Sequence, residues 1–211
     1  MINPQYENLI NSLIKDGYLK TPEIIEAFKA VDRLDFVTEE YKKDAYVNAA
    51  LPISSGQTIS QPLVVAFMIE LLAPKQGEKI LDIGAGSGWK AAILAQIVGS
   101  GGRVISIERI PELADMAKEN ISKYNFIEKG IVEVILGDGS KGYEEEAPFD
   151  KIIAGATAAG EIPEEWKEQL KIGGRIVAPV DNSIVIIDKI SKDKYDRKEH
   201  FGFVFVPLIR D

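Results

Sequence analysis

A glycine-rich turn between a buried strand and a helix is the feature that most constrains the fold of this chain. The turn has the sequence Asp-Ile-Gly-Ala-Gly-Ser-Gly over residues 82–88, directly after the run 79–81. The small and apolar side chains of residues 90–98 then suit a helix packed on a sheet. A strand, a glycine turn and a helix in this order present free backbone N–H groups to a ligand. The same pattern also fits a plain turn without a ligand, so other residues must decide.

Strand-like and helix-like segments alternate from residue 79 onward. The expected strands are 79–83, 103–108, 131–136, 150–154 and 175–180, and the expected helices are 87–98, 111–122 and 163–170. Such alternation predicts an α/β protein with a doubly wound, Rossmann-like sheet that is mostly parallel.

The two ends of the chain differ from this middle part. Short amphipathic helices are expected at residues 6–14 and 22–31. At the other end, the β-rich runs 183–190 and 201–206 flank a charged connection, 191–200, without a helical apolar stripe. Two strands joined without a crossover helix must be antiparallel. The predicted sheet therefore has seven strands and ends in an antiparallel pair.

The length of 211 residues favours a single domain. We expect it to comprise an N-terminal helical and loop region (1–78), an α/β core that binds the ligand (79–180) and the C-terminal antiparallel strands (181–211).

Composition excludes several classes of function. The net charge of −8 argues against a nucleic-acid partner. The chain has no Cys and one His, His200, which argues against thiolate catalysis, a Ser-His-Asp triad and a metal site. No apolar run approaches the ~20 residues that a membrane helix needs, and the start lacks the features of a signal peptide. We therefore expect a cytoplasmic protein without a membrane partner.

Acidic residues follow three neighbouring strands of the predicted sheet. They are Asp82, Glu108 and Asp138. Ligands of open α/β sheets bind at the carboxyl ends of the strands. A carboxylate at Glu108 can accept hydrogen bonds from both hydroxyls of a ribose. A carboxylate at Asp138 can accept a hydrogen bond from an exocyclic amine. Each acid alone could be a solvated strand end, but the three together indicate an adenosyl ligand.

The glycine spacing separates two classes of adenosyl ligand. Dinucleotides are bound by Gly-x-Gly-x-x-Gly, whereas this turn is Asp-x-Gly-x-Gly-x-Gly. The turn resembles the S-adenosyl-L-methionine (SAM) site of the seven-stranded methyltransferases. An NAD oxidoreductase is therefore the least favoured of the functions considered. The resemblance implies SAM as cofactor, S-adenosyl-L-homocysteine (SAH) as product, and cofactor contacts from Asp82, Gly84, Gly86, Gly88, Glu108, Asp138 and Gly139.

The segment 51–62 has no helical or strand period. By itself it fits either a linker that ends in an ordinary helix cap at Ser60 or a binding loop. However, its block Gln57–Ser60, together with Tyr46 before it, resembles the signature loop of the protein-L-isoaspartate O-methyltransferases. Further stretches resemble the same family, so that nearly the whole chain is covered: 107–113, 137–139, 147–150 and 169–175. Trp89-Lys90 departs from the pair Tyr-Gln that is common in the family.

This resemblance implies transfer of a methyl group from SAM to the α-carboxyl group of L-isoaspartyl residues in damaged proteins, followed by closure to a succinimide. It implies that Ser60 is the active-site residue, that Gln57, Thr58, Ile59 and Ser60 close over SAM, and that Tyr46, Ile53, Ser60 and Val206 contact the substrate. A carboxylate, with a pKa near ~4, is already the nucleophile at neutral pH, so no base is needed. The expected partners are isoaspartyl proteins and peptides, and the expected state is a monomer.

Two alternatives stay open at this point. One is a SAM-dependent methyltransferase that acts on a small molecule or on RNA, although the acidic charge disfavours RNA. The other is a protein that binds SAM without catalysis.

Overall fold

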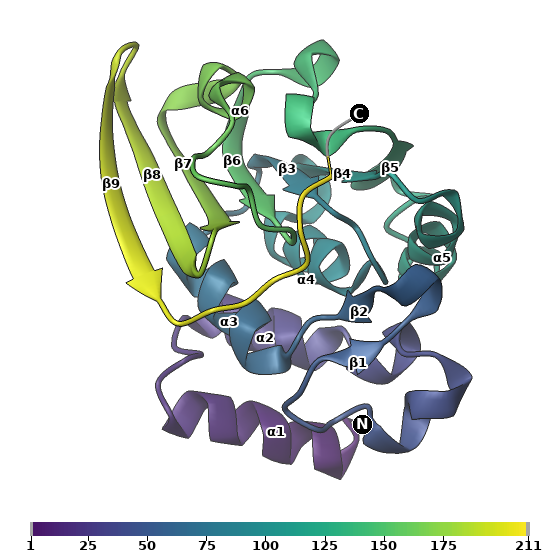
Figure 1. Ribbon diagram of the computed structural model, residues 1–211. Helices are drawn as coiled ribbons and strands as arrows, with labels where there is room; N and C mark the ends of the chain where they lie inside the picture. Colours follow the sequence, from purple (N-terminus) through teal and green to yellow (C-terminus); the bar gives the residue numbers. More distant parts are fainter. Residues whose placement is uncertain (1, 210–211) are drawn as a thin grey trace.

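A seven-stranded mixed sheet forms the centre of the molecule (Figure 1). The computed structural model describes residues 2–209. The strand order is β5-β4-β3-β6-β7-β8-β9, with parallel pairing from β5 to β7 and antiparallel pairing of β7 with β8 and of β8 with β9. The strands are β3 (Lys79–Ile83), β4 (Arg103–Glu108), β5 (Val132–Leu136), β6 (Phe149–Ala154), β7 (Leu170–Val180), β8 (Ser183–Ser191) and β9 (Lys194–Phe201). The predicted α/β fold with an antiparallel end is confirmed.

Helices cover the two faces of the sheet unequally. They are α1 (Pro4–Lys15), α2 (Pro22–Ala30), α3 (Pro62–Leu72), α4 (Trp89–Val98), α5 (Pro111–Ser122) and α6 (Glu164–Glu168). Helices α1 to α5 share one buried apolar cluster with Ile80 of β3, while the next residue, Leu81, belongs to a second cluster with Trp166 of α6. Successive side chains of a strand point to opposite faces, so β3 is buried on both sides. None of the helices in residues 2–209 is long and apolar enough to span a bilayer.

The last strand differs from the prediction. The run 201–206 was expected as a strand, but β9 is formed instead by the charged segment that was expected as a connection. Strand β9 lies at the edge of the sheet and most of its side chains are exposed, so backbone pairing with β8 holds it without an apolar stripe. Charged side chains on an edge strand also hinder pairing with another sheet.

The apolar run after β9 leaves the sheet and crosses over α3 (Figure 1). Phe203 stacks on Phe67 of α3, with ring centroids 5.6 Å apart. Thr157 N–H then donates to the carbonyl of Val206, and Leu208 N–H donates to the carbonyl of Thr157, both at 2.8 Å. These contacts bring the C-terminal segment to the carboxyl ends of the parallel strands.

Strand β7 begins earlier than expected. Residues 173–174, both glycine, were expected as a turn before the strand, but they lie inside it. The register against β6 shifts there, from the pair Phe149–Leu170 to the pair Lys151–Arg175, so the two glycines lie where the pairing is irregular.

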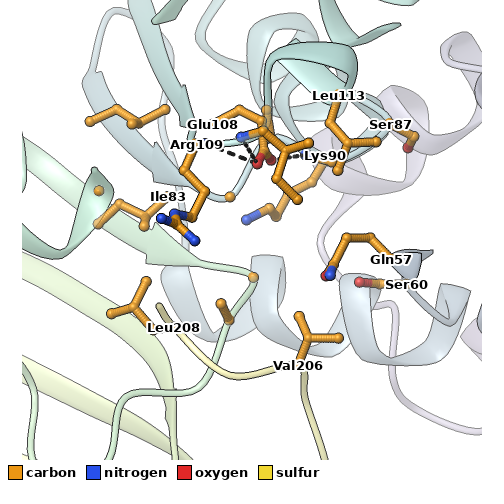
Figure 2. A pocket seen from close by; sticks show the side chains of 18 of the residues that line it. Gln57, Ser60, Ile83, Ser87, Lys90, Glu108, Arg109, Leu113, Val206 and Leu208 are labelled. Carbon is orange, nitrogen blue, oxygen red and sulfur yellow. Dashed lines mark hydrogen bonds between the residues drawn. The ribbon is translucent and has the colours of Figure 1, made fainter. Parts of the chain in front are cut away.

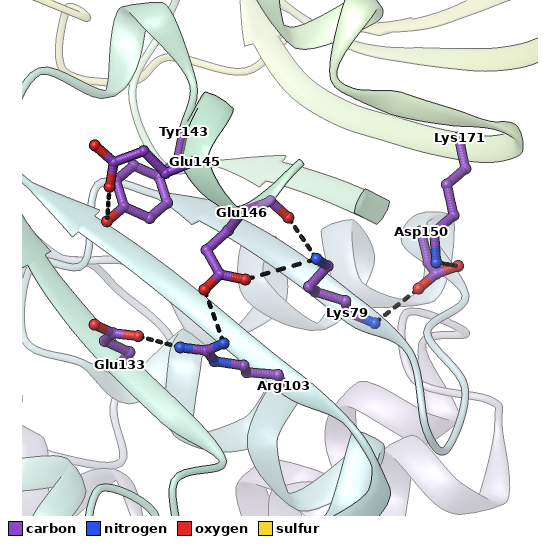
Figure 3. A network of polar contacts seen from close by, with 8 residues as sticks. All are labelled: Lys79, Arg103, Glu133, Tyr143, Glu145, Glu146, Asp150 and Lys171. Atoms are coloured by element: carbon purple, nitrogen blue, oxygen red, sulfur yellow. Dashed lines mark hydrogen bonds and ion pairs between the residues drawn. The ribbon is translucent and has the colours of Figure 1, made fainter. Parts of the chain in front are cut away.

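Ion pairs lie at the amino ends of the parallel strands (Figure 3). Arg103, at the start of β4, pairs with Glu133 and with Glu146, the latter at 2.9 Å. Lys171 pairs with Asp150 at 2.8 Å, and both side chains are partly exposed. The carboxyl ends of the same strands are therefore left to form the ligand site.

Candidate active site

A pocket opens at the carboxyl ends of β3, β4 and β6 (Figure 2). The strand order reverses at β3, because the chain adds β4 and β5 on one side of it and β6 and β7 on the other. Open α/β sheets bind their ligands at such a switch point. The pocket is lined by the glycine turn, the end of β4, Gly155 after β6, residues 57–60 and residues 206–209.

The glycine turn needs its glycines for backbone conformation and for packing. Gly84, Gly86 and Gly88 have positive φ angles of 82°, 54° and 87°, which side chains with a Cβ atom rarely allow. Gly84 and Gly86 line the pocket. Gly88 faces α5, where an added Cβ would lie 3.1 Å from the backbone of Ala117. Of these three glycines, which were predicted to contact the cofactor, Gly84 and Gly86 therefore line the pocket, whereas Gly88 packs against α5.

Glu108 ends β4 inside the pocket lining, and its side chain is buried. One carboxylate oxygen accepts a hydrogen bond from Gly86 N–H at 2.9 Å, and the other accepts from Arg109 N–H at 2.9 Å and Ile110 N–H at 3.1 Å (Figure 2). A carboxylate offers about four lone-pair positions, so Glu108 can still accept from a ligand hydroxyl. The same residue thus shapes the glycine turn and faces the pocket.

Asp82 lies beneath the pocket and is fully buried. Its carboxylate accepts from the hydroxyl of Ser106 at 2.8 Å and forms an ion pair with Lys90 of α4. Lys90 lines the pocket, with 11% of its side chain exposed. Asp82 is not among the lining residues, whereas its ion-pair partner Lys90 is. Sequence reasoning noted Lys90 as a departure from the family pattern but assigned it no role.

Asp138 lies beside the pocket rather than in its lining, whereas Gly137 and Gly139 line it. The carboxylate of Asp138 accepts from the backbone N–H and the hydroxyl of Ser140, at 2.9 and 3.0 Å. An added Cβ at Gly139 would lie 2.6 Å from Ile83, so glycine is required for this approach to β3. A contact between Asp138 and an adenine amine stays a prediction.

Residues 51–59 form a small hairpin of β1 (Leu51–Pro52) and β2 (Thr58–Ile59). Its turn uses positive φ angles at Ser55 and Gly56. The position that caps α3 is Gln61, not Ser60 as the linker interpretation expected. All four residues of Gln57–Ser60 line the pocket, and Figure 2 shows the side chains of Gln57 and Ser60 on the side away from Glu108. The segment is therefore part of the site.

The predicted substrate residues separate into two groups. Ser60 and Val206 line the pocket, whereas Ile53 and Tyr46 are not among its lining residues. Ile53 is a buried residue of the hairpin itself, and its side chain lies close to Gly86, where an added Cβ would be 3.9 Å away. The hydroxyl of Tyr46 donates to the carboxylate of Asp32 at 3.0 Å, and its ring stacks on Tyr6. Burial and the charge of Asp32 raise the pKa of Tyr46, so this hydroxyl keeps its proton.

Arg33 and Arg109 were also missed by sequence reasoning. Arg109 lines the pocket directly after Glu108. Arg33 is fully buried and does not line the pocket. Its side chain donates a hydrogen bond to the carbonyl of Ser60 at 3.1 Å. Arginine is seldom fully buried without a partner, but burial is not visible in a sequence. Among residues 2–209, no cluster of three or more His, Cys, Asp or Glu side chains could hold a metal ion.

Comparison with known proteins identifies the family. The model of the family described as protein-L-isoaspartate(D-aspartate) O-methyltransferase matches residues 4–211. The chain belongs to this family. The protein-L-isoaspartate O-methyltransferase of Methanopyrus kandleri is 45% identical over 207 residues, 96% of this chain and 90% of that protein. The protein-L-isoaspartate O-methyltransferase 2 of Archaeoglobus fulgidus is 50% identical over 189 residues, 88% of this chain and 84% of that protein.

A solved structure agrees with this assignment at the level of the fold. The putative family member of Plasmodium falciparum, crystallised with SAH, has a TM-score of 0.87 at 24% identity and covers 98% of this chain and 99% of its own. The predicted family, fold class and enzyme class are therefore confirmed, and the alternatives of an oxidoreductase and of a SAM-binding protein without catalysis lose their support.

Proposed function

We propose that this chain transfers the methyl group of SAM to the α-carboxyl group of L-isoaspartyl residues in proteins and peptides. The observation that best supports the proposal is that two segments far apart in the sequence line the same pocket. The glycine turn with Glu108 forms one wall, and residues Gln57–Ser60, the block most specific to the family, line the same pocket. Family membership over residues 4–211 supports this substrate.

The residues of the pocket fit SAM as cofactor. Glu108 presents a buried carboxylate for the ribose hydroxyls, and Ile107 and Leu113 provide an apolar surface for the adenine. Gly84 and Gly86 leave room for the methionyl part beside Lys90. When bound, SAM would supply a methyl group whose bond to the sulfonium sulfur breaks as a carboxylate oxygen bonds to the methyl carbon, with SAH as the leaving group.

The protein then has to position the acceptor and exclude water. An isoaspartyl carboxylate is ionised at neutral pH, so the reaction needs no general base. We assign Ser60 the role of donating a hydrogen bond that holds this carboxylate in line. The end of the hairpin and the C-terminal segment around Val206 line the pocket. We assign these segments the role of limiting the access of water to bound SAM.

Paired peptides test the proposed activity. The chain is expected to methylate a peptide with one L-isoaspartyl residue and to leave the twin with a normal aspartyl residue unlabelled. The measurement is the transfer of labelled methyl groups from SAM, with SAH binding by calorimetry as a check on the cofactor site. Equal labelling of both peptides would contradict the proposal, and SAH binding with no labelling of either would favour a different acceptor.

The substitution Ser60→Ala is expected to lower kcat for the isoaspartyl peptide by about 10- to 100-fold, the range of one hydrogen bond to a charged group (~1.5–3 kcal/mol). The dissociation constant of SAH should change less, because Glu108 and the glycine turn are untouched. Ser54→Ala, in the hairpin that precedes Ser60 but outside the pocket lining, is the matched control. An unchanged kcat in Ser60→Ala would remove Ser60 from the mechanism.

A further inference from the structure

Arg33 binds four backbone carbonyl groups with one guanidinium. It begins a short 3₁₀ turn, Arg33–Phe36, and its side chain is fully buried. Nη1 donates to the carbonyls of Ala45 at 2.7 Å and Val47 at 3.2 Å. Nη2 donates to the carbonyls of Ala49 at 2.9 Å and Ser60 at 3.1 Å. The planar fork of arginine suits such a set of acceptors, and the single ammonium of lysine does not.

Three of these carbonyls, those of Ala45, Val47 and Ala49, belong to a segment without regular secondary structure. Residues 45–50 form turns and bends, with neither helix nor strand. Buried carbonyl groups need donors, which regular structure normally supplies from the backbone. Here Arg33 supplies donors, and the backbone N–H of Ala49 also donates to the carbonyl of Val47 at 2.8 Å. Arg33 thereby joins the segment 45–50 to Ser60, which follows the hairpin.

The same side chain also contacts the other wall of the pocket. The guanidinium lies over the ring of Trp89, 5.4 Å from the ring centroid. Trp89 is the first residue of α4, directly after the glycine turn, and it lines the pocket. Arg33 itself is not among the lining residues. Arg33 therefore links Trp89 of α4, on the side of the pocket formed by the glycine turn, to Ser60, on the opposite side.

This arrangement has an energetic cost. Burial lowers the pKa of Arg33 to about 10, so the side chain is still charged at neutral pH. Among residues 2–209, no atom accepts a hydrogen bond from the Nε–H group of Arg33. A buried charge is expensive unless well paired, and the partners described here are carbonyl dipoles and an aromatic ring. We therefore expect the guanidinium of Arg33 to fix the positions of its carbonyl partners more than to raise the free energy of unfolding.

We propose that Arg33 is a positioning residue for methyl transfer, which holds Ser60 at a fixed place relative to the cofactor wall. This inference rests on the proposed function. The hydrogen bond to the carbonyl of Ser60 fixes the peptide unit that follows this residue, and with it the direction of its side chain. Misplacement of a positioning group by about 1 Å can cost roughly 100-fold in rate. Turnover should therefore depend on Arg33 more strongly than cofactor binding does.

The test is Arg33→Lys, assayed with the isoaspartyl peptide well below the melting temperature of the variant. The expected result is a fall in kcat of about tenfold or more, with the dissociation constant of SAH within about threefold of wild type. Hydrogen exchange should be faster at the amides of residues 57–61. Arg175→Lys is the matched control, because Arg175 binds Asp188 and the carbonyl of Leu71 away from the pocket. Its kcat should stay within about twofold of wild type.

The number of SAH molecules bound per chain gives the folded fraction of each variant. If Arg33→Lys does not fold, Arg33→Gln is measured in the same way at a lower temperature. A folded variant with wild-type kcat and wild-type hydrogen exchange would overturn the inference, and so would a failure of both variants to bind SAH, which would show that Arg33 supports the whole fold. If the wild-type chain does not methylate the peptide, the proposed function fails instead, and the hydrogen-exchange result still decides whether Arg33 positions the hairpin.

Discussion

Glu108→Gln is expected to weaken SAH binding by about 10- to 100-fold for each charge-assisted hydrogen bond that is lost (~1.5–3 kcal/mol). Glutamine keeps the size of the side chain, but its NH₂ group cannot accept a hydrogen bond. It therefore cannot replace both carboxylate oxygens, which accept from Gly86, Arg109 and Ile110. The ribose contacts that we propose and the shape of the glycine turn are affected together.

Isothermal titration with SAH measures this effect. Glu112→Gln is the matched control, because Glu112 is exposed in the first turn of α5 and does not line the pocket. Its affinity for SAH should stay within about twofold of wild type, the range of an exposed charge near a helix N-terminus. Equal affinities of the wild type and Glu108→Gln would mean that this carboxylate supports the turn without contacting the cofactor.

Lys90→Met is expected to lower the free energy of unfolding by about 3–5 kcal/mol, the cost of breaking a buried ion pair by removing one partner. Asp82 is fully buried, and among the side chains of residues 2–209 it would keep only the hydroxyl of Ser106 as a partner. Removing both charges in Asp82→Asn/Lys90→Met should cost less than the single change at Lys90, because no unpaired buried carboxylate remains.

Urea unfolding of the chain without ligand measures these differences. The control is Lys171→Met at the opposite end of the strands (Figure 3). Lys171 pairs with Asp150, but its side chain is 41% exposed, so its loss should cost about 0–1 kcal/mol. Equal costs at Lys90 and Lys171 would show that the buried pair contributes nothing beyond a surface pair.

Features that depend on local sequence could be predicted well. The positive φ angles of Gly84 and Gly86 require glycine, and the spacing of these residues alone indicated the turn. Glu108 was placed correctly because a strand fixes its own carboxyl end, and adjacent parallel strands end at the same edge. The block Gln57–Ser60 has no such local signal, and only its resemblance to a family directed attention to it.

Features that depend on contacts between distant segments could not be predicted from periodicity. Strand β9 is held by backbone pairing at a sheet edge, which leaves no apolar pattern in its sequence. The hydrogen bond of Tyr46 to Asp32 joins residues 14 positions apart and could not be read from the sequence, and the contact of Tyr46 with the substrate stays a prediction.

The sequence by itself determined the succession of strands and helices from β3 to β8, the glycine turn and the acid that faces the pocket, because backbone conformation and strand ends are local properties. The tertiary structure alone decided which side chains are buried together. Asp82 meets Lys90 beneath the pocket, and Arg33 meets the carbonyl of Ser60, 27 residues further along the chain. The cost and the geometry of a buried charge depend on what surrounds it in space, and that is fixed only when the chain has folded.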